Sequence, residues 1–433
     1  MYKITNANIK EWAKNYDGEL FDGILCDPPY ELGFMGKSWD SSGIAFDSEM
    51  WADILKLLKP GGHLLAFSGS RTYHRMAVAI EDAGFEIRDQ LIWMYGSGFP
   101  KSLDVSKAID KSLGYERQDV LQEKPKNMDN EVYGKGLGVG ILERKPASDE
   151  AKHWEGYGTA LKPAHEPCVL ARKPLDGTVS QNVLKHGTGG LNIDGTRIAA
   201  ISEKDLKELR SERPSERKGN NQVQTSGDRS DRQHVTGRFP ANLIHDGSDE
   251  VEAVFPQTKA GVAVRRNKGI VASKNVTFNA NDPTNTEDVG YGDSGSASRY
   301  FYCAKASKSE RNAGLEGFEE KVSGGMQGTA DQTLLTGSGN IRNNKAQNHH
   351  PTVKPLSLTK YLATLIKPPT GGRLLVPFSG SGSEMIGALQ AGWEYVEGVE
   401  LTEEYIPIAE ARIKYWLDQM AEEDKQPKQV SLV

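Results

Sequence analysis

The sequence predicts an α/β fold in which helices cover both faces of a doubly wound mixed sheet, and two observations carry this prediction. First, apolar runs typical of strands alternate with stretches of helical spacing in the amino-terminal part, at 3–8, 9–16, 21–26, 51–58, 63–67, 73–83 and 87–95. Second, the same alternation returns near the carboxyl end, at 355–366, 373–378, 384–391, 393–400 and 405–416. Strands that alternate with helices in this way favour one shared sheet.

A long stretch between these two blocks has a different composition. From 114 to 347 the chain is dense in glycine, serine, amides and charged residues, with brief apolar runs near 165–171 and 298–304. Because 433 residues exceed one ordinary domain, we expect a core domain that carries a large insertion. The expected division is 1–113, 114–347 and 348–433, with the two apolar runs as candidate core strands.

Composition argues against several classes of protein. No run of about eighteen apolar residues is present and the amino terminus does not have the pattern of a signal peptide, so we expect a cytoplasmic protein without a membrane span. Cys26, Cys168 and Cys303 lie far apart in the sequence, which indicates neither a zinc site nor a disulfide framework. The net charge of -6 argues against a uniformly basic nucleic-acid binder but leaves open a local basic face.

The first candidate site follows the strand expected at 21–26. Asp27, Pro28, Pro29 and Tyr30 come directly after it, and two consecutive prolines leave nearby carbonyls free to accept hydrogen bonds from groups outside the sheet. A carboxylate, a free carbonyl and an aromatic ring therefore lie close together at the carboxyl end of a strand. In open α/β sheets, this edge is where ligands bind.

A glycine turn near the carboxyl end forms the second candidate site. The segment 379–383, with the sequence SGSGS, joins the strand at 373–378 to the helix at 384–391. Glycine lets the backbone approach a ligand closely, and the unpaired N–H groups of a helix N-terminus attract a carboxylate. The next strand ends in Glu400, an acid placed to hold two ribose hydroxyls. A dinucleotide-binding oxidoreductase is disfavoured, because Met385 occupies the third glycine position of G-x-G-x-x-G.

The first site resembles the DPPY motif of the DNA amino-methyltransferases, which move a methyl group from S-adenosylmethionine to the exocyclic nitrogen of adenine or cytosine. Residues 377–382 resemble the PFxGSG motif with which this family holds its cofactor. The order of catalytic motif, insertion and cofactor motif resembles the β class of the family and the longer methylases of phage and prophage type. The resemblance implies a Rossmann-like fold, with a catalytic half at 1–113, target recognition at 114–347 and a cofactor-binding half at 348–433.

The resemblance also assigns roles to individual residues, and no metal is implied. It gives catalysis to Asp27, Pro28, Pro29 and Tyr30. It gives binding of S-adenosylmethionine to Asn8, Asp27, Thr352, Lys354, Pro377, Phe378, Ser379, Gly380, Ser381, Gly382 and Glu400. Three features depart from the family pattern: Asn8 and Val376 stand where the family commonly has Asp, and Ser383-Glu384 replaces a usual Thr-Thr pair.

Duplex DNA is the partner that the resemblance implies, and one stretch of the insertion offers a contact for it. The range 259–280 contains basic residues and asparagines but no acidic residue. Lysine and arginine attract phosphate, while arginine and asparagine can also bind base edges. We therefore expect DNA contacts from Lys259, Arg265, Arg266, Lys268 and Lys274. A solvated basic loop without a partner would have the same composition.

Adenine-N6 is the first choice of target, because Asp at the head of the motif is commoner among the family's adenine enzymes and Ser among its cytosine-N4 enzymes. Cytosine-N4 methylation stays open. So does a DNA-binding module that keeps the fold without turnover, for which Asn8 and Val376 are the motivating departures. RNA and protein glutamine are disfavoured substrates, since glutamine enzymes usually pair Asn with Pro-Pro-Tyr. The target sequence, a homodimer and a restriction partner stay undetermined.

Overall fold

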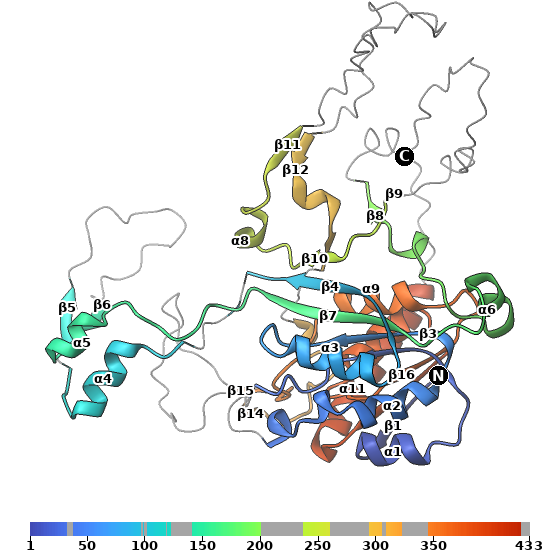
Figure 1. Cartoon of the computed structure of the whole chain (residues 1–433), viewed down its shortest axis with the longest axis horizontal. Coiled ribbons are helices and arrows are strands. Elements are labelled where there is room, and N and C mark those ends of the chain that lie inside the picture. The colour runs from blue at the N-terminus through green and yellow to red at the C-terminus, as the bar shows by residue number, and fades with distance from the viewer. Residues whose placement is uncertain are drawn as a thin grey trace, which may run out of the picture. The chain divides into compact units, whose positions relative to one another are not determined.

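The computed structural model describes residues 1–32, 38–96, 98, 102–117, 119–122, 141–200, 237–259, 294–304, 309–322 and 345–425. Its main element is a nine-stranded sheet with the strand order β1-β17-β16-β2-β3-β7-β4-β10-β13 (Figure 1). These strands are β1 (Tyr2–Asn6), β2 (Phe21–Cys26), β3 (Leu58–Phe67), β4 (Glu86–Met94), β7 (His165–Arg172), β10 (Leu243–His245), β13 (Tyr302–Cys303), β16 (Arg373–Val376) and β17 (Tyr395–Glu400). Neighbours pair in parallel except at β7, which is antiparallel to β3 and β4. The predicted mixed sheet is confirmed.

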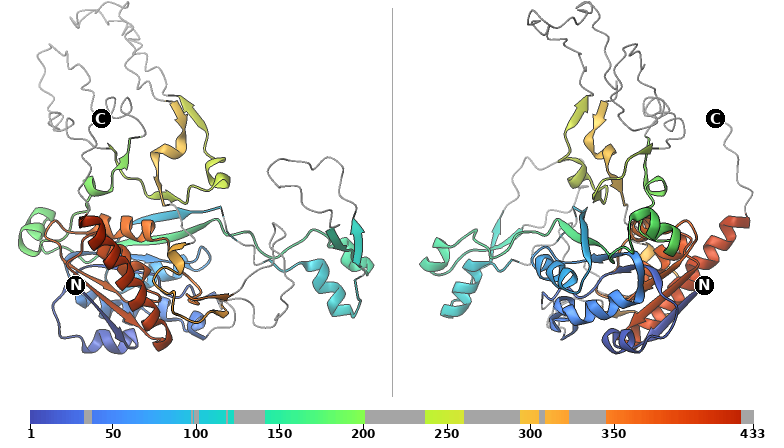
Figure 2. Two further views of the ribbon diagram at one scale, coloured as in Figure 1. Left: turned by 180° about the vertical axis from the view of Figure 1, so that it is seen from behind. Right: turned by 45° about the vertical axis from the view of Figure 1, so that its right-hand side comes forward.

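Helices cover both faces of this sheet, as a doubly wound fold requires. One set is α1 (Ile9–Asn15), α2 (Ser48–Leu57) and α3 (Tyr73–Asp82), and the other is α9 (Leu356–Ile366), α10 (Ser383–Gln390) and α11 (Ile406–Lys425). Figure 2, which turns the molecule around, shows α11 on the face opposite the first set. Successive strand residues alternate between two cores: Ile24 and Cys26 pack with the first set, whereas Leu25 packs with the second. This double burial explains why β2 is apolar from Ile24 to Cys26.

Several elements have other bounds than the sequence predicts. β3, for example, begins at Leu58, five residues before the strand expected at 63–67. The strand expected at 3–8 ends at Asn6, because the Asn8 side chain accepts a hydrogen bond from the Lys10 N–H at 3.0 Å and begins α1 as its N-cap. The run expected as a strand at 298–304 is strand only at Tyr302–Cys303 and is preceded by a 3-10 helix, Ala297–Tyr300. There the Arg299 guanidinium donates to nearby main-chain carbonyls at 2.6 Å, which stabilises a turn.

The chain divides into two compact units. The first contains 1–96, 165–323 and 346–433, and the second contains 97–164 and 324–345. The second unit includes α4 (Val105–Leu113), β5 (Asp119–Gln122), β6 (Ile141–Arg144) and α5 (Asp149–His153). Within it, buried Asp110 accepts hydrogen bonds from the Arg117 guanidinium at 2.7 Å and the Ser148 N–H at 2.9 Å. The main sheet takes in β7, β10 and β13 from the range 114–347. β7 and β13 lie in the two apolar runs expected as core strands, whereas β10 is a strand that the sequence does not predict.

The first unit also contains shorter elements. They include α6 (Val179–His186), β8 (Ile198–Ala199), β9 (Gly237–Arg238), α8 (Asp249–Glu252), β11 (Gln257–Lys259), β12 (Ser294–Ser296) and β14 (Lys321–Val322). Across the ranges that the structure describes, no helix combines the length and the apolar character that crossing a membrane needs. In the same ranges, no group of three or more His, Cys, Asp and Glu side chains is arranged to hold a metal ion.

Candidate active site

The two motifs found in the sequence meet at one edge of the sheet. β2 and β16 are parallel neighbours, with Gly23 opposite Leu374 and Ile24 opposite Leu375. Asp27 follows the carboxyl end of β2, and Pro377 follows the carboxyl end of β16. Because parallel strands end at the same edge, the DPPY segment and the glycine turn emerge side by side. This is the edge at which α/β sheets bind ligands.

The glycine turn is fixed by hydrogen bonds to the end of β17. The Gly380 N–H donates to Glu400 Oε2 at 2.8 Å, and the Thr402 N–H donates to Glu400 Oε1 at 2.7 Å. Gly380 has a φ of +47°, and a Cβ atom there would lie 2.8 Å from His350 Nε2, so this position needs glycine. Burial raises the pKa of Glu400, although both N–H groups oppose the rise. The turn and the acid form one fixed unit.

Asp27 has two carboxylate oxygens with different surroundings. Oδ2 accepts a hydrogen bond from Lys354 Nζ at 2.5 Å. Oδ1 is buried and has no hydrogen-bond partner within the described part of the chain. Buried carboxylate oxygens normally have a donor, so an unpaired one at a ligand-binding edge indicates a place for a ligand's N–H group. Pro28 beside it is buried, and Pro29 and Tyr30 are half-buried.

A polar cluster holds Asp27 in place, and we call Asp27, Tyr30, Glu166 and Lys354 the Lys354 cluster. The Lys354 ammonium lies 3.0 Å from the Tyr30 hydroxyl and 3.2 Å from Glu166 Oε2, in addition to its contact with Asp27. The Tyr30 hydroxyl donates to Glu166 Oε2 at 2.8 Å. Four polar groups from three distant segments of the chain are therefore linked directly.

Electrostatics fixes the protonation states of Lys354 and Tyr30. Burial lowers the pKa of Lys354, but the charges of Asp27 and Glu166 outweigh it, and the net shift is a rise. Burial raises the pKa of Tyr30 well above its usual value, and the charges of Asp27 and Glu166 add to the rise. The ammonium therefore stays charged and the phenol stays protonated at neutral pH, so both act as donors.

Glu384, in the first turn of α10, places a third carboxylate near the cluster. Its side chain is buried. Burial raises its pKa to about 7, and the charge of Asp27 adds to the rise, while Lys354 and Arg412 oppose it. Glu384 is thus divided between its two protonation states near neutral pH, unlike an ordinary surface glutamate.

The other residues that the family resemblance assigns to cofactor binding differ in burial and in hydrogen bonding. Pro377, Ser379, Gly380, Ser381 and Gly382 are buried, and Phe378 is half-buried. The Asn8 side-chain oxygen is used by the cap of α1. Thr352 is exposed, and its N–H donates to His350 Nδ1 at 3.3 Å. For the expected DNA contacts, the Lys259 backbone lies in β11, while the Lys259 side chain and residues Arg265, Arg266, Lys268 and Lys274 lie outside the described residues.

Sequence reasoning does not find Glu166 or His350. Glu166 stands at the beginning of an apolar run, and site residues are expected at the carboxyl ends of parallel strands. Because β7 runs antiparallel, its beginning reaches the same edge at which its neighbours end, and Glu166 is paired with Trp93 at the end of β4. His350 precedes α9 in a segment without strand or helix periodicity. The only signal for either residue was a titratable side chain next to a buried element.

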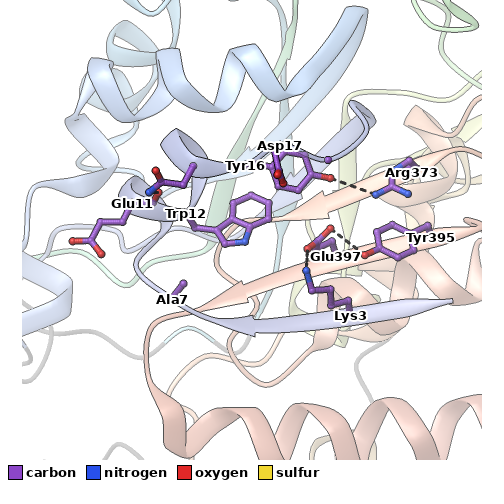
Figure 3. A pocket seen from close by; sticks show the side chains of 11 residues that line it. Lys3, Ala7, Glu11, Trp12, Tyr16, Asp17, Arg373, Tyr395 and Glu397 are labelled. Atoms are coloured by element: carbon purple, nitrogen blue, oxygen red, sulfur yellow. Dashed lines mark hydrogen bonds and ion pairs between the residues drawn. The ribbon is translucent and has the colours of Figure 1, made fainter.

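A groove of about 510 Å³ lies elsewhere in the first unit, over β1 and α1 (Figure 3). Its lining includes Trp12, Arg373, Tyr395 and Glu397. Glu397 is paired inside it, because Lys3 Nζ lies 2.9 Å away and the Tyr395 hydroxyl donates to it at 3.1 Å. No lining residue belongs to the Lys354 cluster or to the glycine turn. This groove is therefore separate from the candidate active site.

The DNA methylase family model, which covers N6 and N4 amino-methyltransferases, matches residues 21–411. The chain belongs to this family, whose methyl donor is S-adenosylmethionine.

The sequence identity between this chain and individual known proteins is low. The chain is similar to the type II methyltransferase M.HindIII of Haemophilus influenzae, with 24% identity over 148 residues. That match covers 33% of this chain and 37% of the relative, so the chain spans little more than a third of that relative's length. Among solved structures it is similar to a complex of M1.HpyAVI with SAM, with 13% identity, a TM-score of 0.37 and coverage of 95% of this chain and 99% of that one. For the cytosine-N4-specific PvuII DNA methyltransferase, identity is 10%, the TM-score is 0.41 and coverage is 96% and 90%.

The residues at the shared edge fit S-adenosylmethionine, which carries a positive sulfonium and two ribose hydroxyls. The bare backbone at Gly380, where a Cβ would strike His350, permits close approach of a ligand. Glu400 presents a carboxylate that is already oriented by main-chain N–H groups. The carboxylate of Asp27 adds negative charge nearby, and Glu384 adds to it in its ionised form. The set of donors and acceptors therefore suits a cationic nucleoside.

Proposed function

We propose that this protein is a site-specific DNA methyltransferase that transfers the methyl group of S-adenosylmethionine to the N6 amino group of adenine in duplex DNA. The observation that carries the proposal is the buried Oδ1 of Asp27, which has no hydrogen-bond partner among the described residues. Asp27 directly follows β2, the neighbour of the strand that leads into the glycine turn. An acceptor in that position suits an amino group, which arrives with two hydrogens to donate. Membership of the DNA methylase family supports DNA as the substrate.

The amino nitrogen of a base is a poor nucleophile, because its lone pair is delocalised into the ring. Asp27 Oδ1 accepts one amino hydrogen, and the Pro28 carbonyl accepts the other. These two acceptors draw the nitrogen toward a tetrahedral shape, which frees its lone pair. They also stabilise the positive charge that develops on the nitrogen, and they are in place before the reaction begins. Positioning, rather than a covalent intermediate, accounts for the catalysis.

When bound, S-adenosylmethionine supplies an electrophilic methyl group on a positively charged sulfur. The segment 377–382 would line it with backbone, and Glu400 would accept hydrogen bonds from the ribose hydroxyls. Asn8 and Thr352 remain assigned to the same ligand by family resemblance. The side-chain amide N–H of Asn8 is the group left for it, since its oxygen caps α1.

The target base must leave the stack to reach Asp27, because its amino group is otherwise inside the duplex. Tyr30 supplies the ring on which the flipped base stacks. Lys259, Arg265, Arg266, Lys268 and Lys274 remain our candidates for phosphate and base-edge contacts. Asp at the head of the motif favours adenine over cytosine as the target.

Mass analysis of nucleosides tests the proposal directly. DNA from a host that expresses the chain would be digested and compared with DNA from a host that expresses Asp27→Ala. We expect N6-methyladenine with the parent and none with the variant. N4-methylcytosine would move the target to cytosine and keep the rest of the proposal, whereas unmodified bases with the parent protein would overturn it.

A second candidate is a DNA-binding module without turnover. It is favoured by the use of the Asn8 oxygen as a helix cap and by the apolar, fully buried Val376 where the family commonly has Asp. Calorimetric titration with S-adenosylmethionine separates the two candidates. Binding favours the enzyme, and its absence in a folded protein that retains DNA favours the module.

A further inference from the structure

The Lys354 ammonium has three hydrogens and three oxygen partners. They are Asp27 Oδ2 at 2.5 Å, the Tyr30 hydroxyl at 3.0 Å and Glu166 Oε2 at 3.2 Å. Two of these contacts, to Asp27 and Tyr30, are hydrogen bonds, and the contact with Glu166 is an ion pair. The Lys354 side chain is 5% exposed. Lys354 therefore links the catalytic motif to Glu166 from inside the protein.

Glu166 closes this arrangement from a third element. Its Oε2 accepts from the Tyr30 hydroxyl at 2.8 Å and faces the Lys354 ammonium. Tyr30 is thus fixed at two points, by its backbone after β2 and by its hydroxyl. Without the second point, the ring could rotate about its side-chain bonds. A ring on which a base stacks loses less entropy on binding when its plane is already fixed.

The charges of the cluster are unequal, which distinguishes it from an ordinary ion pair. Asp27 and Glu166 together carry two negative charges, and Lys354 carries one positive charge. At the other end of β7, Glu86 lies 2.6 Å from Arg172 and 4.0 Å from Arg88, so that negative charge is not in excess there, and this group has no role in the proposed chemistry. An excess of negative charge in a buried place is costly by itself. It becomes favourable when a positive charge develops on a substrate nitrogen nearby.

We infer that Glu166 is a positioning residue for methyl transfer, which acts through Tyr30 and Lys354 to hold the base-stacking ring and to keep Asp27 Oδ1 free for the amino group. This inference rests on the proposed function. Glu166 reaches the site because β7 is the antiparallel strand of the sheet, so that its beginning lies between the ends of β3 and β4. Glu166 itself does not touch the reacting nitrogen in this assignment.

The test compares Glu166→Gln with Glu86→Gln, which makes the same change on the Arg172 pair far from the site. Single-turnover methylation of duplex DNA gives the rate, calorimetry gives the affinity for S-adenosylmethionine, and 2-aminopurine at the target position reports base flipping by its fluorescence. For Glu166→Gln we expect a rate lower by about 10- to 100-fold and a weaker flipping signal, because a small misplacement of the ring is enough for such a loss. Cofactor affinity should change less than about twofold by the same reasoning, since the cofactor's own contacts are kept. Glu86→Gln should keep the parent rate.

A double-variant cycle tests whether Glu166 acts through Tyr30. If Glu166 acts through the Tyr30 hydroxyl, the losses of methylation rate caused by Glu166→Gln and Tyr30→Phe should not multiply. The double variant should then be about as slow as the slower single variant. A parent rate in folded Glu166→Gln, or fully multiplicative effects, would overturn the inference. So would a loss of cofactor affinity equal to the loss of rate. An inactive parent protein would instead count against the proposed function. Glu166→Asp, which keeps the charge, serves if Glu166→Gln does not fold, and it should retain more of the rate than Glu166→Ala.

Discussion

Replacing Glu384 with glutamine tests whether a buried carboxylate strains the site at neutral pH. Burial, followed by the charge of Asp27, raises the pKa of Glu384 from 4.5 to about 7. The folded protein therefore binds a proton on Glu384 more tightly than the unfolded chain does. Stability that depends on this group is present below pH 4.5 and is lost as pH rises toward 7. At about 1.4 kcal/mol for each pKa unit, the loss comes to about 3 kcal/mol.

Glutamine has nearly the shape of the protonated acid and does not ionise. Glu384→Gln should therefore raise the free energy of unfolding by about 3 kcal/mol at pH 8 and by much less at pH 5. Urea titration followed by circular dichroism, repeated at both pH values for parent and variant, measures this difference. Only the difference between the two proteins is used, because titrating groups far from Glu384 contribute equally to both.

Glu397→Gln provides a contrast with the opposite sign. Glu397 is equally buried, but it is paired with Lys3 at 2.9 Å and with the Tyr395 hydroxyl at 3.1 Å. Its replacement should lower stability at both pH values, since it leaves Lys3 without a counter-charge and weakens the hydrogen bond from Tyr395. The reasoning about Glu384 would be refuted by an equal effect of Glu384→Gln at pH 5 and pH 8, or by a loss of stability at pH 8.

Three further predictions concern catalysis, packing and acid stability. Asp27→Asn keeps the shape of the side chain but removes the charge that pairs with Lys354. The rate of single-turnover methylation should fall by about 100- to 1,000-fold. A variant as fast as the parent protein would contradict the role of Asp27. Gly387→Ala would place a Cβ 2.3 Å from Thr359 Oγ1, where α10 meets α9, and should cost about 3 kcal/mol of stability, so an unchanged Tm would show that this contact can relax. Burial lowers the pKa of His63 from 6.5 to about 4. As pH drops from 6.5 to 4, the unfolded chain is therefore protonated before the folded protein, and the free energy of unfolding decreases. His63→Gln should flatten this dependence in unfolding titrations from pH 7 to pH 4, and an unaltered slope would assign it to other groups.

Much of the secondary structure was set by local sequence. The strand expected at 21–26 is β2 with the same bounds, and the helix expected at 73–83 is α3 to within one residue. Apolar periodicity gives such elements because it acts over a few neighbouring residues. Both motifs were also visible, since proline after β2 and glycine after β16 change the backbone at their own positions. The roles that the family resemblance gives to Asn8 and Thr352 remain predictions.

The tertiary structure alone decided how these pieces combine into a site. Lys354 and Asp27 are 327 residues apart in the chain, and nothing in either segment specifies the other. The direction of β7, which brings Glu166 to the shared edge, is not encoded in its apolar run, because parallel and antiparallel ladders use the same backbone N–H and C=O groups. The raised pKa of Glu384 likewise depends on burial by distant elements. Sequence determined which side chains this protein has for chemistry; strand order, strand direction and burial, which arise from long-range packing, decided which of them meet.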